Sequence, residues 1–548
     1  MIFFITTDSN HYAEQLIQSY CHFHFSEKIQ LFKAKSLQAV FVGCQKVELK
    51  KHVVFIYGNA FPPKNENLKS CLEEIAQQGA GQEQMNGNFN LIIFDKKEDG
   101  EADQSFSILS DRHASLPVFF SQQSACVQVS SVFELLLLDN KDCRFNESAL
   151  LDYLCLGYVL PGESLWKTIQ MLPKDKCLNV LPSKQELFLE DVFSKNKPDR
   201  AYYPSLKSAG EAFVEKLRET LEDEFNFLGV SQMELTGGTD TRILISCMMK
   251  LQRKSLGYRT FEQAFWSSAN NDSIVAKKIA KEFNLNHFSE KIPVTVKTDF
   301  PISYLLPEIS AYPVKILSGL FGSELFGGAV LQADSVLDYR LSDRIDKIKD
   351  GLFQLTVAKE DYKRLGSPWE RLKHKIIYSN HPFKEQDLAQ QILLRSHWTS
   401  IYSSFNSPFF IEPYYHIKNN KVCPYLDTRM IDFFLNCPRE FLLSYILYEY
   451  VFCHLADKRW TEIPFHSNMM KFVEVFSKIN PEKAVMGNVG VESACNYKVY
   501  FERNFSPSLF EDTFLEKISV KEADKIPSDI LFKICDLNCF MLELQKRK

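Results

Sequence analysis

A turn of six residues, 236–241 (TGGTDT), constrains the fold most, because it stands between a stretch that predicts a strand, 230–235, and one that predicts a helix. Gly237 and Gly238 let the backbone approach an anion closely and adopt unusual dihedral angles. Successive N–H groups at the start of the helix would then form an anion-binding concavity. The alternative is an ordinary tight turn, which a short glycine motif does not exclude.

The side chains of the turn extend this interpretation. Thr236 and Thr241 supply hydroxyl donors, and Asp240 suits a ligand of Mg²⁺ better than a direct neighbour of phosphate. The Gly-Lys-Ser/Thr ending of a Walker A loop is missing. Arg242 follows directly, and either a phosphate contact or a structural salt bridge would account for it.

Beyond about residue 211, helical and strand patterns alternate along the chain. Helices are expected at 212–225 and from an N-capping Asp272 to 284, and strands at 255–258, 287–292 and 314–317. This alternation predicts an α/β fold with a parallel, doubly wound sheet, in which ligands bind at the carboxyl ends of the strands. The remainder, 342–548, predicts mainly helix.

The first 195 or so residues are β-rich instead. Short apolar runs at 39–42, 53–57 and 90–94 predict strands, and 95–104 (DKKEDGEADQ) predicts a charged hairpin-like loop. The stretch 194–210, with two prolines and several charges, predicts a linker. A chain of 548 residues has room for roughly two to four domains.

Three segments occur in a recognisable order: 235–242 (LTGGTDTR), 318–328 (SGLFGSELFGG) and 424–427 (PYLD). The first resembles the Ser-Gly-Gly-x-Asp-Ser loop of the asparagine synthetase family. The second resembles that family's Ser-Gly-x-Gly-x-Asp-Glu-x-Phe-Gly-Gly loop, and the third its Pro-Phe-Leu-Asp element. Two linked loops are more specific than either alone. For the third segment, a plain helix start capped by Asp427 is equally open.

The N-terminal half carries a second resemblance. Residues 86–89 (NGNF) and 110–120 (SDRHASLPVFF) are similar to the family's class II glutamine amidotransferase domain, and 130–131 and 151–172 also fit. The resemblance implies three parts. They are a degenerate amidotransferase-like domain at 1–195, built as an αββα Ntn-hydrolase-like sandwich; an ATP pyrophosphatase (PP-loop) domain at 209–475, with a doubly wound parallel sheet; and a helical C-terminal extension at 476–548.

The same resemblance implies a ligand set. In this family ATP is cut between its α and β phosphates, and the first loop holds the departing pyrophosphate. ATP and Mg²⁺ are therefore the expected cofactors, with Asp240 and Glu324 as catalytic residues and metal ligands. The expected nucleotide contacts are Leu235, Thr236, Gly237, Gly238, Thr239, Asp240, Thr241, Ser318 and Gly319.

Several positions depart from the family pattern. The amidotransferase nucleophile is a Cys directly after the initiator Met, with its own α-amine as base, whereas residue 2 here is Ile2. We therefore expect no glutaminase activity, as in the β-lactam synthetase branch. In the second loop Ser323 replaces an Asp, and Leu320 stands where amide-forming members often have an acid. Glu324 either faces the metal or is a charge at a helix N-terminus.

A lysine near the reacting carbonyl is also missing. The family often places it after the Pro-Phe-Leu-Asp element, but the matching stretch, 441–448 (FLLSYILY), has none. Lys458 and Arg459 lie further along the chain. A solvated surface pair is the expected role for these two residues.

Two functions are compatible with these residues. The first is an ATP-dependent amide-forming ligase, which activates a small-molecule or peptide carboxylate as an acyl-adenylate for attack by ammonia or an amine, releasing AMP and pyrophosphate. Lactam and macrocycle formation, as in the β-lactam synthetase and lasso-peptide cyclase branches, are included. The second is a catalytically impaired nucleotide-binding or scaffold protein. The retained Asp240 favours the enzyme, while substrate identity and oligomeric state, a homodimer among the options, stay open.

Composition limits the other classes. The net charge of −5 and the pI of about 6.2 argue against a nucleic-acid binder, which needs clustered Lys and Arg. The 14 cysteines show no CxxC pair, and the 12 histidines show no metal-ligand pattern. The N-terminus has no signal-peptide pattern, and apolar runs are far shorter than the roughly 20 residues of a membrane span. We expect a cytoplasmic protein with no membrane partner.

Overall fold

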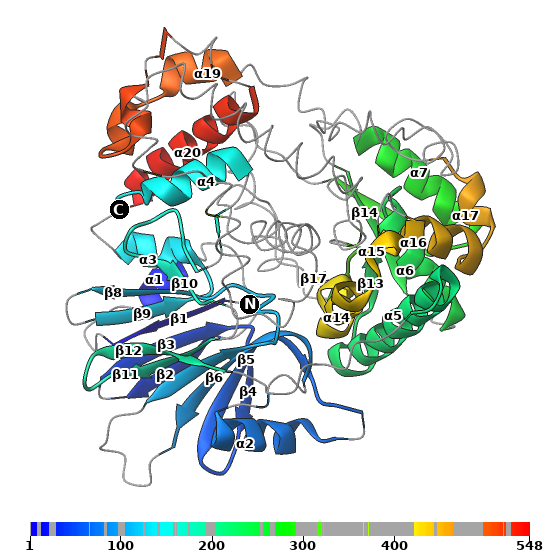
Figure 1. Cartoon of the computed structure of the whole chain (residues 1–548), viewed down its shortest axis with the longest axis horizontal. Coiled ribbons are helices and arrows are strands. Elements are labelled where there is room, and N and C mark those ends of the chain that lie inside the picture. The colour runs from blue at the N-terminus through cyan, green and yellow to red at the C-terminus, as the bar shows by residue number, and fades with distance from the viewer. Residues whose placement is uncertain are drawn as a thin grey trace.

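A computed structural model shows an N-terminal pair of stacked sheets, a separate parallel sheet, and C-terminal helices that return to the N-terminal part (Figure 1). It describes residues 2–7, 13–20, 29–34, 36–64, 66–79, 81, 85–96, 105–123, 126–139, 143–156, 159–160, 162–173, 176–192, 203–251, 256–262, 269–291, 315–319, 322, 365, 371, 421–442, 446–464, 497–518, 520–521, 526 and 528–547.

Two six-stranded antiparallel sheets form the N-terminal part. The order in the first is β10 (Gln170–Met171), β8 (Phe119–Gln123), β9 (Cys126–Ser130), β1 (Ile2–Thr6), β3 (Leu37–Val42) and β2 (Ile29–Ala34). The order in the second is β12 (Glu186–Asp191), β11 (Lys176–Leu181), β7 (Phe106–Ser110), β6 (Asn86–Asp95), β5 (His52–Phe61) and β4 (Gln45–Glu48). The strands expected at 39–42, 53–57 and 90–94 lie within β3, β5 and β6. Strands β6 and β7 pair antiparallel, and the charged loop expected between them lies outside the described residues at 97–104.

The two sheets pack face to face through aromatic side chains. Phe41 of β3 stacks on Phe55 of β5 with ring centroids 3.7 Å apart, and Phe32 lies 4.3 Å from Phe94. Because side chains alternate along a strand, the opposite faces carry a second apolar set that helices cover. Helix α2 (Leu68–Gln78) covers the second sheet, while α1 (Ala13–Tyr20), α3 (Phe133–Asp139) and α4 (Glu147–Leu156) lie over the first. The layers therefore run helix, sheet, sheet, helix.

The second group of elements is built on a parallel five-stranded sheet. Its order is β15 (His287–Lys291), β14 (Gly257–Glu262), β13 (Gln232–Glu234), β16 (Ile316–Leu317) and β17 (Lys421–Val422). All neighbouring strands are parallel. The chain adds β14 and β15 on one side of β13 and then β16 and β17 on the other, so the direction reverses between β13 and β16. The mixed α/β class, with antiparallel and parallel sheets, is confirmed.

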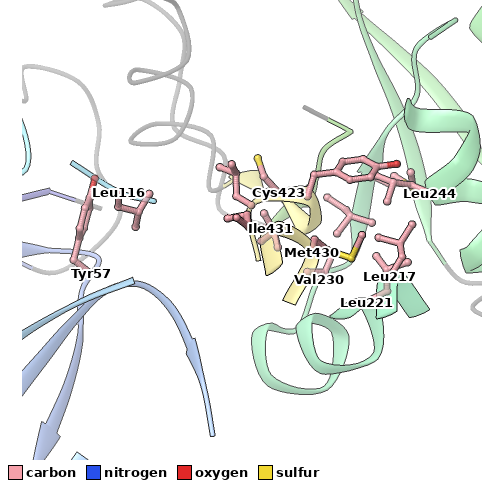
Figure 2. Close-up of a cluster of buried hydrophobic side chains, with 14 of the residues drawn as sticks. Tyr57, Leu116, Leu217, Leu221, Val230, Leu244, Cys423, Met430 and Ile431 are labelled. Atoms are coloured by element: carbon pink, nitrogen blue, oxygen red, sulfur yellow. The ribbon is translucent and has the colours of Figure 1, made fainter. Parts of the chain in front are cut away.

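Helices of the parallel-sheet part pack into one core. They are α5 (Leu206–Leu228), α6 (Thr239–Lys250), α7 (Ala269–Glu282), η4 (Pro424–Leu426), α14 (Thr428–Asn436), α15 (Arg439–Leu442), α16 (Ile446–Tyr450), the π-helical turn η6 (Val451–Leu455) and α17 (Arg459–Glu462). Figure 2 shows Leu217 and Leu221 of α5 beside Leu244 of α6 and Met430 of α14. All four side chains are fully buried.

Two helix starts differ from expectation. Helix α5 begins at Leu206, where Ser205 and Ser208 form a reciprocal capping box, so the end of the expected linker 194–210 is helical. Helix α7 begins at Ala269, so Asp272 lies inside the helix and is not its N-cap. Ser, Asn and Asp favour loops as well as first turns, and their pattern alone does not separate the two. The rest of the expected linker, 194–202, lies outside the described residues.

The C-terminal helices pack on the N-terminal part. Helices α19 (Tyr497–Asn504) and α20 (Ser528–Arg547), with the 3-10 turns η7 (Pro507–Phe510) and η8 (Phe514–Lys517) between them, lie against the helical layer of the first sheet. Figure 1 shows α20 alongside α4. Ile530, Ile534 and Leu537 are fully buried there. In the described part of the chain, no helix combines the length and apolarity needed to cross a membrane.

Candidate functional site

The expected loops meet at one edge of the parallel sheet. Residues 235–238 follow β13, Ser318 and Gly319 follow β16, and residues 423–427 follow β17. These are three neighbouring parallel strands, and the first two flank the point where the strand order reverses. In open α/β sheets ligands bind at the carboxyl ends of strands at such a point. This edge is therefore the candidate site.

Close backbone contacts hold the second loop on the first. A Cβ added to Gly319 would lie 2.9 Å from the hydroxyl and 3.0 Å from the backbone nitrogen of Thr241. A Cβ added to Gly322 would lie 2.6 Å from the Asp240 carboxylate and 2.8 Å from the ring of Tyr425. A side chain at Gly319 would meet the backbone of Thr241, whereas one at Gly322 would have to displace the side chains of Asp240 and Tyr425.

The glycines of the turn do not adopt the unusual dihedral angles expected of them. Gly238 has φ −75° and ψ 160°, an extended conformation open to any residue, and Gly237 has no positive φ either. Close approach is the physical reason for Gly238, because a Cβ there would lie 3.3 Å from the hydroxyl of Thr236. That part of the sequence-based argument was wrong.

The two threonine hydroxyls of the turn contact each other. The oxygens of Thr236 and Thr241 are 2.9 Å apart, and the N–H of Gly238 donates to Thr236 at 3.2 Å. Two hydroxyls carry two protons and their mutual bond uses one, so the pair retains one donor for a ligand. Gly238 is the N-cap of α6 and supplies no capping side chain. The start of α6 thus has the donors that an anion requires.

Asp240 lies in the first turn of α6 and is held by two tyrosines. The Tyr448 hydroxyl, from α16, donates to its Oδ1. The Tyr425 hydroxyl donates to its backbone carbonyl at 3.2 Å. Tyr448 was not among the expected site residues, because nothing local in the sequence connects α16 with the turn.

Leu235 directly precedes the turn and Thr239 lies within it, and both residues are buried. The N–H of Leu235 donates to the backbone carbonyl of Arg259 at 2.7 Å, and the carbonyl of Leu235 accepts from the Thr260 hydroxyl at 2.6 Å. These bonds attach the end of β13 to β14. Thr239 is the first residue of α6 and is buried.

Arg242 is fully buried and braces the turn. Its guanidinium donates to the carbonyls of Gly237 at 3.0 Å, Ile463 at 2.9 Å, Trp460 at 3.2 Å and Pro464 at 2.6 Å. These four contacts give Arg242 a structural role at the turn. The turn is thereby attached to the segment at α17.

A buried acid, Glu234, joins β13 to β16. The Ser318 hydroxyl donates to its Oε2, and both residues are buried. The sequence carried no clear signal for this role, because β13 (QME) holds two polar residues among three. Ser318 also donates its N–H to the carbonyl of Val422 at 2.8 Å, so one serine connects all three strands of the site edge.

Asp427 starts a helix. Its carboxylate accepts from the N–H of Arg429 at 2.9 Å, which makes it the N-cap of α14, and it forms an ion pair with the Arg429 guanidinium. Of the two interpretations of segment 424–427, the plain helix start capped by Asp427 is therefore the one that the structure shows for this residue. Burial alone would lower the pKa of Arg429, but Asp427 and Asp223 raise it. Burial raises the pKa of the neighbouring Glu224 well above its usual value.

Lys458 and Arg459 lie at the surface, as expected. Arg459 pairs with Asp457 at 2.8 Å and stacks over the ring of Phe283 at 4.2 Å. Both side chains are exposed. Both residues therefore have the surface position that was expected of them.

Part of the second loop lies outside the described residues, namely 320–321 and 323–328, which include Leu320, Ser323 and Glu324. The expected role of Glu324 as a metal ligand stays a prediction. Within the described ranges, no group of three His, Cys, Asp or Glu residues is placed to hold a metal ion. Mg²⁺ usually needs only one or two carboxylates beside phosphate oxygens and water, so Asp240 fits such a site.

The amidotransferase-like segments connect the two parts of the molecule. Asp111 is buried and accepts from the N–H groups of Phe89, His113 and Ser115. This arrangement turns the next two side chains toward α14. There Arg112 and His113 contact the Asp432 carboxylate, the imidazole at 2.6 Å.

Comparisons with known proteins add little to this picture. No family model matches the chain, and no curated protein matches it. Among solved structures it is similar to the glutamine phosphoribosylpyrophosphate (PRPP) amidotransferase from B. subtilis complexed with ADP and GMP, at 7% identity over 63% of this chain and 79% of that one, with a TM-score of 0.23. It is also similar to a structure titled the allosteric regulatory enzyme of purine biosynthesis, at 8% identity over 55% and 83%, with a TM-score of 0.23. The strand order of the chain itself, rather than these superpositions, defines its fold.

Proposed function

We propose that this chain is an ATP-dependent amide-forming ligase of the asparagine synthetase kind. A substrate carboxylate is activated as an acyl-adenylate, pyrophosphate leaves, and ammonia or an amine captures the acyl group with release of AMP. One observation carries the proposal: the three family-like loops follow three neighbouring parallel strands, at the reversal of strand order. The N-terminal sandwich, in this proposal, is a degenerate amidotransferase-like domain.

In this proposal the residues of the turn have separate roles in binding ATP. The first N–H groups of α6 and the hydroxyl pair of Thr236 and Thr241 bind phosphate oxygens, which stabilises the charge on leaving pyrophosphate. Asp240 would hold Mg²⁺, which would supply positive charge to offset the negative charges of carboxylate and phosphate. Arg242 keeps the turn rigid, so that its donors need little rearrangement.

Ammonia or a substrate amine is the nitrogen source in this proposal. Strand β1 (IFFIT) carries no thiol, and its Phe3 is tied by its N–H to the hydroxyl of Ser131 at 3.0 Å. The nucleophile of a class II amidotransferase is a cysteine at this end of the chain. Addition of glutamine is therefore expected to change nothing.

Pyrophosphate–ATP exchange tests the ligase. Purified full-length protein is incubated with ATP, Mg²⁺ and pools of carboxylates, and labelled pyrophosphate is followed into ATP. Exchange is expected with the wild type and should fall at least about 100-fold in Asp240→Ala, since the metal-held charge acts on the transition state. Asp457→Ala is the matched control, because Asp457 belongs to an exposed pair with Arg459.

One observation favours the second candidate, a nucleotide-binding scaffold. Tyr448, a neutral phenol, lies in the stretch 441–448 where the family often places a lysine, and it bonds to Asp240. The same assay separates the two candidates. Binding of ATP without exchange across broad carboxylate pools would replace the ligase by the scaffold. Glutamate formed from added glutamine would overturn the assignment of the N-terminal domain.

A further inference from the structure

Tyr448 brings a distant helix to the metal-binding acid of the candidate site. It lies on α16, 208 residues from Asp240 in the sequence, and its ring is buried. Helix α16 packs on α5 and continues into η6, which contacts α6. The phenol is therefore held by the core, and its hydrogen bond to Asp240 Oδ1 restricts the rotation of the carboxylate.

Two tyrosines hold different parts of the same residue. Tyr425 donates to the backbone carbonyl of Asp240, which fixes the main chain of the first helical turn. Tyr448 donates to a carboxylate oxygen, which fixes the side chain. The backbone of Gly322 closes a further side, because a Cβ there would lie 2.6 Å from Oδ1. The Tyr425 contact therefore offers a natural control for the Tyr448 contact.

We propose that Tyr448 is a positioning residue that makes Asp240 a one-oxygen ligand and thereby selects Mg²⁺. The phenol takes one lone-pair position of Oδ1 and the backbone of Gly322 lies against the same oxygen, so the geometry disfavours a cation that binds both carboxylate oxygens at once. Mg²⁺ accepts single-oxygen carboxylate ligands in a strict octahedron, whereas Ca²⁺ also takes two-oxygen carboxylates in larger shells. The inference rests on the proposed binding of Mg-ATP at this turn.

Metal-dependent nucleotide binding tests this role without relying on turnover. Binding of ATP is titrated with Mg²⁺ and, separately, with Ca²⁺, for the wild type, Tyr448→Phe and Tyr425→Phe, and once with EDTA. Loss of a hydrogen bond to a charged group changes an equilibrium by about tenfold. Tyr448→Phe should raise the Mg²⁺ concentration for half-maximal binding by about that factor and narrow the preference for Mg²⁺ over Ca²⁺.

The control variant should separate positioning from general loosening. Tyr425→Phe is expected to keep the wild-type ratio of Mg²⁺ to Ca²⁺ dependence, and both variants should keep the wild-type affinity measured in EDTA. In an Asp240→Asn background, Tyr448→Phe should have no further effect on metal dependence.

Two results would overturn the inference while leaving the proposed function intact. One is a wild-type metal dependence in Tyr448→Phe, and the other is the same change of metal preference in Tyr425→Phe. A wild-type chain whose ATP binding ignores Mg²⁺ would instead remove the proposed function, and the role of Tyr448 with it. A thermal melt of each variant shows whether the fold is retained.

Discussion

At the scale of the residue, the site depends on backbone contacts that leave no room for a side chain. Gly319 packs on the start of α6 where a Cβ would lie 3.0 Å from the backbone nitrogen of Thr241. A backbone atom cannot move aside as a flexible side chain would. Gly238 is less confined, because among the described residues its added Cβ would meet the Thr236 hydroxyl alone, at 3.3 Å.

Gly319→Ala should therefore disrupt the site more than Gly238→Ala. Overpacking of this kind costs about 1–3 kcal/mol, and it should appear as a loss of ATP affinity because the second loop must shift off the turn. Nucleotide titrations and thermal melts of both variants measure the difference. Equal effects of the two substitutions would contradict the argument, as would full ATP affinity in Gly319→Ala.

Residue types alone predicted part of this site. The sequence of the turn 236–241 predicted a strand-to-helix connection with anion donors, since glycine and hydroxyl residues act locally. It did not predict that Arg242 would bind four carbonyls, because three of them, in 460–464, come from a segment distant in sequence. It mistook the reason for Gly238, because only the fold shows which atoms a Cβ would meet.

At the scale of the element, a buried acid on α5 has an unfavourable charge. Glu224 faces Asp427, Arg429 and Asp223, and burial and the nearby carboxylates raise its pKa. Among the described residues, its Oε2 has no hydrogen-bond partner. A carboxyl whose pKa is higher in the folded than in the unfolded state stabilises the fold when protonated. That contribution is complete below the unfolded pKa of about 4.3 and is lost as the pH rises through the folded pKa.

Glu224→Gln should remove this pH dependence. The variant is expected to be more stable than the wild type at neutral pH and to lose that advantage below about pH 4, where Glu224 is protonated in both states. Thermal melts from pH 4 to 8 measure the change. Glu222→Gln, at an exposed position of the same helix, is the matched control and should stay within about 0.5 kcal/mol of wild type. A Glu224→Gln variant that is less stable at neutral pH would contradict the prediction.

At the scale of the whole molecule, the two parts of the chain are joined in at least two places. One is the contact of Arg112 and His113 with Asp432. Burial alone would raise the pKa of Asp432, but the charges of His113 and Arg112 lower it to about 2. The other is the return of α19 and α20 to the helical layer of the N-terminal sandwich.

Removal of residues 497–548 should destabilise the N-terminal sandwich rather than the parallel sheet. Ile530, Ile534 and Leu537 are fully buried in this contact. Burial of each such side chain contributes about 1.5–3 kcal/mol, so the loss should exceed about 4 kcal/mol. Thermal unfolding followed with a dye for exposed apolar surface measures it, while ATP titration reports on the parallel-sheet part.

A milder variant controls for gross misfolding. Ile534→Ala keeps the helix and should cost about 2–5 kcal/mol, because it leaves a cavity in the same contact. If both variants unfolded like the wild type, the C-terminal helices would have no stabilising role in the sandwich. If ATP binding were lost with the sandwich intact, the helices would serve the other part of the molecule.

The sequence by itself determined the local structure and its order: alternating strands and helices after residue 211, β-strands before it, and a Gly-rich turn between strand and helix. These features follow from side-chain periodicity and turn chemistry, which act between residues close in the chain. Only the tertiary structure decided that Tyr448 bonds to Asp240, that Glu234 joins two strands, and that α20 packs on α4. Such contacts depend on how distant elements pack, and neither partner carries a local sign of the other.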